Sequence, residues 1–421
     1  MKSTGWASLR SELISPFGVR EPPTDAGYRV IFLCQPNRLF VRVLVITEKR
    51  VRLIQYDRAG ALYTPLINYH DNPHMLIRFV VGLASRYEDQ LGLDTSVQWG
   101  TQGGRKTPVI ITITDPFTGL PRVYTMLTVR PFINRADLCG RGTRMWDVTD
   151  KDGGDLVLKD AWSTGAHGKP EHVYLAKAEG IEGVQRLVDY EDRTGRPNGE
   201  IRSFRPASVW RPFTNKSFQR IVTPLYGSPI ERFNDEAELL EALHDAIAAH
   251  RKLLERGVLH CDISTGNILF GEGKNPSPGL RGILIDLDYA TEVDYTRPSI
   301  NLRSGTRFYQ SIILLKGLAG QYKPAHDHLD DLESFYYVLL DLVFGRCDPG
   351  KSWVIDWMED EWDNDVTTTN CLRPPRRTSS EGPSNCETSL RSGVRSARRC
   401  WCACTTLLGS LLGRRVQSWG I

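Results

Sequence analysis

The stretch at residues 257–270, GVLHCDISTGNILF, decides the fold because it sets polar side chains at fixed spacing between two apolar segments. An acid, Asp262, stands two residues after His260, and an amide, Asn267, stands five residues after that acid. Phosphoryl transfer needs such a pair, since a carboxylate can accept or orient the proton of an acceptor hydroxyl and an amide oxygen can bind Mg²⁺. Alone, the H-x-D-x-x-x-x-N pattern is weak, because a loop acid and a loop amide often coincide by chance.

A second acid follows an apolar run downstream. The run at residues 282–290, GILIDLDYA, predicts a buried strand that leads to Asp286, a hairpin's distance after Asn267. An acid just past such a strand can face the same pocket as Asp262. Asp286 and Asn267 would then offer the hard oxygen atoms that Mg²⁺ prefers. The alternative is that Asp286 only closes a turn.

A glycine pair and a lysine lie upstream of these acids. Gly140 and Gly142, in a strand–turn–strand setting, allow backbone to approach phosphates, although a plain hairpin turn has the same pattern. Lys159 ends the apolar run LVLK, and a lysine at the end of a buried strand requires a carboxylate or a phosphate beside it. Glu171, on the next predicted helix, is the first candidate for that carboxylate, and Glu179 in the same helix is its rival.

Apolar periodicity predicts the remaining elements. The expected strands cover residues 28–34, 39–47, 50–57, 108–114 and 121–130, with three short strands in 137–160. One expected helix begins at Pro73, and three others cover 170–180, 235–257 and 330–345. The last of these helices is apolar enough to be predicted as buried. For the helix at 235–257 the predicted buried face is Leu239, Leu240, Leu243, Ile247, His250 and Leu254.

These pieces, in this order, resemble the signature set of protein kinases. The chain as a whole resembles the fungal-type protein kinase family over roughly residues 30–345. The blocks that carry the resemblance are YDRAGALYTP, GRGTRMWDV, LVLKDAW, GVLHCDISTGNILF, LIDLDYA, SGTRFYQS and LDDLESFYYVLL.

The resemblance implies an α+β, two-lobed protein-kinase-like fold. The N-terminal lobe would be mostly antiparallel β with an extra N-terminal α/β region, and the mainly α-helical C-terminal lobe looks truncated. The expected organisation is a poorly ordered lead-in at 1–27, the family-specific α/β region at 28–135, the kinase N-lobe at 136–226, the C-lobe at 227–365 and a basic, disordered tail at 366–421.

The resemblance also implies an ATP- and Mg²⁺-dependent kinase that transfers the γ-phosphate to Ser or Thr hydroxyls of a protein substrate. Asp262 would be the catalytic base, while Asn267 and Asp286 would bind Mg²⁺. Lys159 would hold the α- and β-phosphates, with Glu171 bracing it.

Three further roles follow from the same resemblance. Gly140 and Gly142 would form the cover over the nucleotide phosphates. The segment at 304–311, SGTRFYQS, would end the activation segment and shape the acceptor site. Asp331 would tie its helix to the catalytic loop.

Four residues depart from the usual kinase pattern. Cys261 replaces the arginine of H-R-D, which argues against activation by a phosphorylated loop. Ser264 stands where many kinases have a lysine, Asp288 replaces the glycine of D-F-G, and Met145 replaces the third glycine of G-x-G-x-x-G. Two other functions therefore stay open: a catalytically weak pseudokinase that acts as a binding or scaffold module, and a small-molecule phosphotransferase.

Composition fits an intracellular protein, either cytoplasmic or nuclear, with no membrane segment. The chain has 421 residues, of which 40% are hydrophobic and 24% charged, and its net charge is +3. Residues 371–421 contain nine arginines and two acids, so a mildly acidic body precedes a basic tail. That distribution does not indicate a dedicated nucleic-acid binder. Nucleotide and a protein substrate are the expected partners.

Overall fold

The computed structural model describes residues 35–135, 140–164, 169–206, 213–273, 276–293, 305–319 and 325–346, all of which lie in the unit Met1–Lys351. The predictions of a lead-in at 1–27, a strand at 28–34 and a basic tail at 366–421 fall outside the described residues. No helix in the described ranges has the length and apolar character that crossing a membrane requires.

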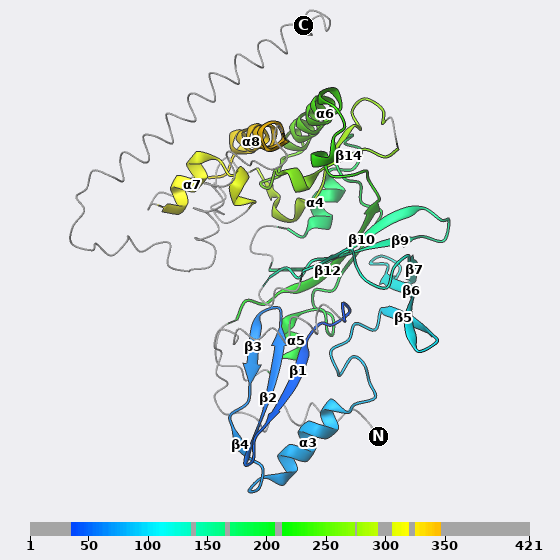
Figure 1. The fold of residues 1–421 in the computed structure, drawn as a ribbon, viewed down its shortest axis with the longest axis vertical. Helices are drawn as coiled ribbons and strands as arrows, with labels where there is room; N and C mark the ends of the chain where they lie inside the picture. Colours follow the sequence, from blue (N-terminus) through cyan, green and yellow to red (C-terminus); the bar gives the residue numbers. More distant parts are fainter. Residues whose placement is uncertain are drawn as a thin grey trace, which may run out of the picture. The chain divides into compact units, whose positions relative to one another are not determined.

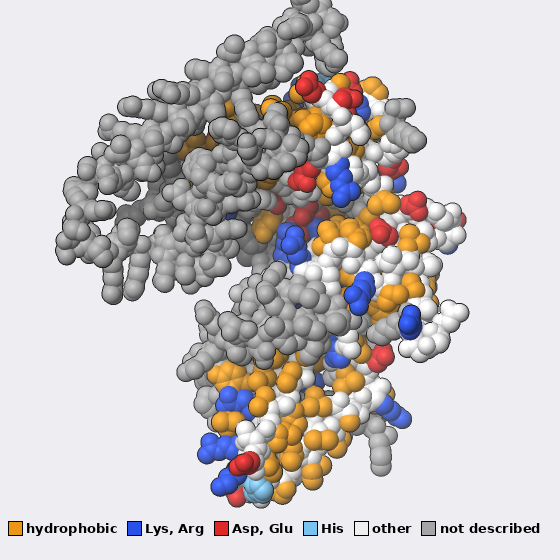
Figure 2. Space-filling model, viewed as in Figure 1, with side chains coloured by type: hydrophobic (Ala, Val, Ile, Leu, Met, Phe, Trp, Pro, Cys, Tyr) orange, Lys and Arg blue, Asp and Glu red, His pale blue; other side chains and the backbone are white. Residues whose placement is uncertain are grey.

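The N-terminal sheet consists of four short antiparallel strands (Figure 1). They are β1 (Val41–Ile46), β2 (Arg50–Asp57), β3 (Gly60–Tyr63) and β4 (Ile67–Asn68), and β2 pairs with the other three. Helix α3 (Pro73–Leu83) begins at the predicted proline and packs Met75 and Phe79 against Val51 and Leu53. Figure 2 shows hydrophobic side chains gathered at the surface of this region. Helix α3 itself exposes Ile77, Val80 and Val81.

The second, larger sheet is antiparallel throughout and has the order β11-β12-β10-β9-β7-β6-β5, with β8 paired to β9. Its strands are β5 (Val97–Gln102), β6 (Arg105–Thr114), β7 (Pro121–Met126), β8 (Ile133–Asn134), β9 (Arg144–Thr149), β10 (Asp155–Ser163), β11 (Asp189–Asp192) and β12 (Ser217–Pro224). Of the three strands predicted in 137–160, the two that follow the turn at 140–143 are confirmed as β9 and β10, and the first, before Gly140, falls outside the described residues. The sheet also combines strands from both sides of residue 135.

The C-terminal part is mainly helical. Its helices and 3₁₀ turns are η1 (Ile230–Arg232), α6 (Glu236–Glu255), η2 (Thr265–Asn267), η3 (Leu287–Tyr289), η4 (Arg307–Tyr309), α7 (Ile312–Ala319) and α8 (His328–Arg346). Two helices, α4 (Glu171–Lys177) and α5 (Ile201–Phe204), come earlier in the chain, between strands of the larger sheet. Two short antiparallel pairs join β13 (Val258–Leu259) to β16 (Thr291–Glu292) and β14 (Ile268–Phe270) to β15 (Gly282–Leu284). The predicted α+β class, with an antiparallel β lobe and a mainly helical lobe, is confirmed.

One core joins the helices α4, α6 and α8. It contains Tyr174 and Leu175 of α4, Leu243 of α6, and Phe335 and Val338 of α8. The prediction that the helix at 330–345 is buried holds for one side only, because the other side of α8 exposes Leu329 and Leu332.

Helix α6 starts and ends where its sequence predicts. The Asp235 side chain accepts a hydrogen bond from the Glu238 backbone N–H at 2.9 Å, and Gly257 follows the helix in the left-handed conformation, with φ 72°. Its buried face differs from the prediction, since Leu240 and Ile247 are 42% and 39% exposed. The buried stripe instead includes the alanines at 242, 246 and 249.

The small side chains of this stripe let the β14–β15 hairpin approach the helix closely. A Cβ atom on Gly282 of β15 would lie 2.0 Å from the backbone oxygen of Ala242. Close packing against the hairpin therefore decides which face of α6 is buried. The number of large apolar residues on each face does not decide it.

Candidate functional site

Lys159 and Glu171 form a buried ion pair. Lys159 lies within β10, paired to Met145 of β9 and Ile221 of β12, and so not at the strand's end as predicted. Its Nζ atom donates to Glu171 Oε2 at 2.8 Å, and both side chains are at most 5% exposed. Glu171 is the first residue of α4, whereas the rival Glu179 lies past the end of that helix and is exposed.

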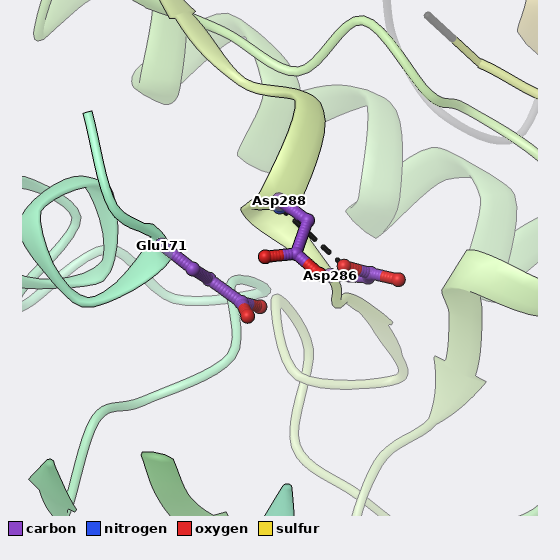
Figure 3. Close-up of side chains that lie close together, drawn as sticks. All are labelled: Glu171, Asp286 and Asp288. Carbon is purple, nitrogen blue, oxygen red and sulfur yellow. Dashed lines mark hydrogen bonds between the residues drawn. The ribbon is translucent and has the colours of Figure 1, made fainter. Parts of the chain in front are cut away.

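Two aspartates complete this ion cluster. Asp286, just past β15, is held in the left-handed conformation with φ 64°, and its Oδ1 accepts from Lys159 Nζ at 2.8 Å. Asp288 Oδ2 lies 3.1 Å from the same Nζ atom and 2.6 Å from a guanidinium nitrogen of Arg141. Carboxyl oxygens of Glu171, Asp286 and Asp288 lie within 4.8 Å of one another (Figure 3).

The charges in this cluster shift one another's pKa values. Burial raises the pKa of Glu171, and the nearby Asp288 raises it further. Burial also acts to raise the pKa of Asp286, but the charges of Lys159 and Arg141 outweigh it and hold that pKa well below its usual range. Burial would lower the pKa of Lys159, yet Asp286, Asp288 and Glu171 raise it. Asp286 and Lys159 are therefore both charged at neutral pH.

Asp262 lies at the C-lobe side of the site, on the loop that follows β13. Its Oδ1 accepts from the backbone N–H of Thr306 at 2.8 Å and from the Thr306 hydroxyl at 3.0 Å. Asn267 donates its side-chain N–H to the Asp262 carbonyl at 2.8 Å, which leaves the amide oxygen as its remaining side-chain polar atom. Burial raises the pKa of Asp262, and the charge of Asp286 adds to the effect.

Asp331 of α8 fixes the loop that carries Asp262, as predicted. Its Oδ2 accepts from the backbone N–H groups of His260 and Cys261, each at 3.2 Å, and from His250 Nε2 at 2.9 Å. Cys261 is buried with φ 62°, a conformation that is strained for a residue with a side chain. The hydrogen bonds that the His260 and Cys261 N–H groups donate to Asp331 hold the backbone in that conformation.

His260 holds the two halves of the site together. Its Nδ1 accepts from the Asp262 backbone N–H at 3.3 Å, so its Nε2 carries the proton and donates to the Ile285 carbonyl at 3.1 Å. Burial lowers the pKa of His260, which favours this neutral form. The loop of Asp262 is thereby linked to the residue that precedes Asp286.

The glycine turn at 140–142 is anchored to the protein at each residue. The Gly140 carbonyl accepts from Lys216 Nζ at 2.9 Å, and the Arg141 carbonyl accepts from the Trp162 backbone N–H at 2.8 Å. Gly142 has φ 55°, and a Cβ atom there would lie 2.4 Å from Arg58 Nε. The absence of a side chain at 142 is therefore required by Arg58; a phosphate-covering role for the two glycines stays a prediction.

Sequence reasoning assigned no site role to three residues that the structure places there: Arg141, Asp288 and Thr306. Each was within a quoted motif, since Arg141 stands between the two glycines and Asp288 stands two residues after Asp286. For Arg141 and Asp288, the sequence feature that could have indicated a site role is an ionisable residue inside a turn, next to a residue predicted to bind phosphate or metal. Thr306 gives a weaker signal, because its contact with Asp262 spans 44 residues.

Comparison with known proteins gives one family. The family described as fungal protein kinase matches residues 26–207 and 192–343 of the chain. No curated protein matches the chain significantly. The match covers most of the sequence and includes every residue of the ion cluster and of the Asp262 loop. The chain therefore belongs to the fungal protein kinase family.

Proposed function

We propose that this chain is an ATP- and Mg²⁺-dependent protein kinase that transfers the γ-phosphate to Ser or Thr hydroxyls. The observation that carries the proposal is the link from Lys159 and Glu171 of the N-lobe to Asp286 of the C-lobe, beside a separately held carboxylate, Asp262. Membership of a protein kinase family supports the same reaction type.

The residues present fit a magnesium ion and a nucleotide. Asp286 is ionised, and Asp288 offers a carboxyl oxygen within 4.8 Å of one of Asp286. The amide oxygen of Asn267 would add a further hard oxygen donor of the kind that Mg²⁺ binds. Lys159 and Arg141 are cations that match phosphate oxygens in charge. When bound, Mg²⁺ would neutralise charge on the phosphates during transfer.

Asp262 would position the acceptor hydroxyl. Thr306 fixes one of its carboxylate oxygens, so the other oxygen is left to accept the hydroxyl proton. The raised pKa of Asp262 makes it a stronger base than a solvent-exposed aspartate. His260 and Asn267 hold the backbone on either side, which fixes the direction of the carboxylate.

One observation favours a second function, a nucleotide-binding scaffold with little turnover. Ser264 is buried where many kinases carry a lysine, so the catalytic loop supplies no cation to the transferred phosphate. Under that function the protein binds Mg²⁺–ATP and transfers nothing.

Thermal melting with and without ATP, each with and without Mg²⁺, tests the nucleotide site without knowledge of the substrate. At about 100 times its dissociation constant a ligand adds about 2.7 kcal/mol to the free energy of unfolding. We expect this stabilisation to require Mg²⁺, to vanish in Asp286→Asn and to persist in the surface control Asp152→Asn. Wild-type protein that melts cooperatively without any shift would refute the proposal.

Labelled ATP and a library of Ser, Thr and Tyr peptides then test transfer. Label on Ser or Thr peptides, lost in Asp262→Asn, supports the kinase. Mg²⁺–ATP binding without label on any peptide or on the protein itself would establish the scaffold instead.

A further inference from the structure

Arg141 reaches the ion cluster from the anchored turn between Gly140 and Gly142. The hydrogen bond from Trp162 to its carbonyl fixes its backbone beside β10, the strand that carries Lys159. Its guanidinium carbon lies 4.7 Å from the centroid of the Tyr289 ring, and its side chain remains 35% exposed. The guanidinium group is thus oriented into the site while keeping access to solvent.

Arg141 and Lys159 share the same acids. One guanidinium nitrogen of Arg141 lies 2.6 Å from Asp288 Oδ2 and 3.6 Å from Asp286 Oδ1, and Lys159 Nζ contacts these same two oxygens. The two cations therefore lie within two hydrogen-bond lengths of each other. A phosphate group that binds between the two cations would contact both.

The charges of the cluster suit an exchange of partners. Three carboxyl groups, of Glu171, Asp286 and Asp288, face two cations in the free protein. A magnesium ion that binds Asp286 and Asp288 would compete with Lys159 and Arg141 for their oxygens. Cations released in this way would have phosphate oxygens as their new partners, and a guanidinium can bind two of these at once.

The catalytic loop does not supply such a cation itself. Ser264 supplies no positive charge, and within the described residues Arg141 is the cation besides Lys159 that contacts Asp286 or Asp288. A short, anchored turn with a glycine on each side brings Arg141 to this place without a long flexible loop.

We propose that Arg141 binds the phosphate chain of Mg²⁺-bound nucleoside triphosphate and provides the positive charge that the catalytic loop lacks at Ser264. In the free protein Asp288 holds the guanidinium group in place. This inference rests on the proposed function.

Equilibrium binding measured by calorimetry tests the inference. Wild type and Arg141→Gln are titrated with Mg²⁺–ATP and, separately, with adenosine, which lacks phosphate. We expect Arg141→Gln to lower the affinity for Mg²⁺–ATP by about 10- to 100-fold, as for the loss of a hydrogen bond to a charged group. The affinity for adenosine should not change. Arg141→Lys, which keeps the charge without the planar fork, should give an intermediate affinity for Mg²⁺–ATP.

Arg122→Gln is the matched control, because Arg122 also bridges two acids, Asp115 and Asp189, but does so on β7 without contacting the ion cluster. Its affinity for Mg²⁺–ATP should equal that of wild type. Unchanged or tighter binding of Mg²⁺–ATP by Arg141→Gln would overturn the inference, as would an equal loss for adenosine. If Arg141→Gln does not fold, wild-type affinity in Arg141→Lys overturns it. Wild-type protein that binds no Mg²⁺–ATP would instead refute the proposed function itself.

Discussion

Thr306 donates two hydrogen bonds to one carboxylate oxygen of Asp262, from its backbone N–H at 2.8 Å and from its hydroxyl at 3.0 Å. Two donors on one oxygen fix the plane of the carboxylate. They also lower the pKa of Asp262 against burial and the charge of Asp286, both of which raise it. Thr306 therefore controls the direction and the basicity of the proposed catalytic base.

We expect Thr306→Val to lower kcat by about 10- to 100-fold, because it removes one hydrogen bond to a charged group. The pKa of Asp262 should rise in this variant, so the acid limb of the pH profile of kcat should move to higher pH. Thr306→Ser keeps both donors and should behave as wild type. An acid limb at the same pH in Thr306→Val and wild type would contradict this role.

Asp262→Asn should lower phosphate transfer by about 10²- to 10⁴-fold, the usual effect of losing a general base. Nucleotide binding should persist, because the Asp262 side chain makes no contact with Lys159 or Asp288 among the described interactions. Labelled transfer and Mg²⁺–ATP melting, measured on the same preparation, separate the two effects. Substantial transfer by the variant would remove Asp262 from its assigned role.

Asp331→Asn should lower the free energy of unfolding by about 3–5 kcal/mol near pH 6, the usual result of breaking a buried ion pair. The affected partners are the backbone N–H groups of His260 and Cys261 and the imidazoles of His250 and His326. Urea unfolding of wild type and variant measures the difference.

The interaction of Asp331 with its histidine partners makes the stability difference between wild type and Asp331→Asn depend on pH. Burial acts to raise the pKa of Asp331, but hydrogen bonds from His250 and His326 outweigh it and hold this pKa below its usual value. The stabilisation that the Asp331 carboxylate contributes therefore weakens as the pH falls below about 4. Burial would lower the pKa of His326, but Asp331 raises it. The stabilisation that protonated His326 contributes is therefore full below about pH 6.5 and is lost as the pH rises through the raised pKa of His326. The stability difference between wild type and Asp331→Asn should therefore be largest between these limits. A difference that does not vary with pH would contradict the assignment.

Ala242→Leu should lower the free energy of unfolding by about 1–3 kcal/mol, because the added methyl groups would have to displace the hairpin that packs on α6. Leu240→Ala, on the exposed face, should change it by less than about 0.5 kcal/mol. Chemical unfolding of the two variants identifies the buried face directly. A larger loss for Leu240→Ala would restore the face that the sequence predicted.

The sequence predicted those parts of the fold that depend on neighbouring residues. The helix cap at Asp235, the proline start of α3 and the β2 strand all follow from local chemistry. The pairing of Lys159 with Glu171 was also predicted, because Glu171 lies on the helix that follows the strand of Lys159. Their catalytic roles stay proposals.

Contacts between segments that are distant in the sequence were harder to predict. The buried face of α6 depends on Gly282, which permits the approach of a hairpin whose position periodicity does not encode. The contact of Arg141 with Asp288 spans 147 residues, and neither residue belongs to a kinase motif in its usual form. A motif specifies the residues that it expects, so it gives no role to charged residues such as Arg141 and Asp288 at its other positions.

The Gly142–Arg58 contact makes the N-terminal sheet a structural support of the turn at residues 140–142. Arg58, at the β2–β3 turn, is fully buried, and Lys216 Nζ donates both to the Arg58 carbonyl and to that of Gly140. The turn that carries Arg141 is thus held by Arg58, which precedes the kinase motifs, and by Lys216, which directly precedes β12. A shortened chain that starts at residue 136 would lose Arg58 together with β5, β6 and β7, so the N-terminal region is best regarded as an integral scaffold of the proposed nucleotide site.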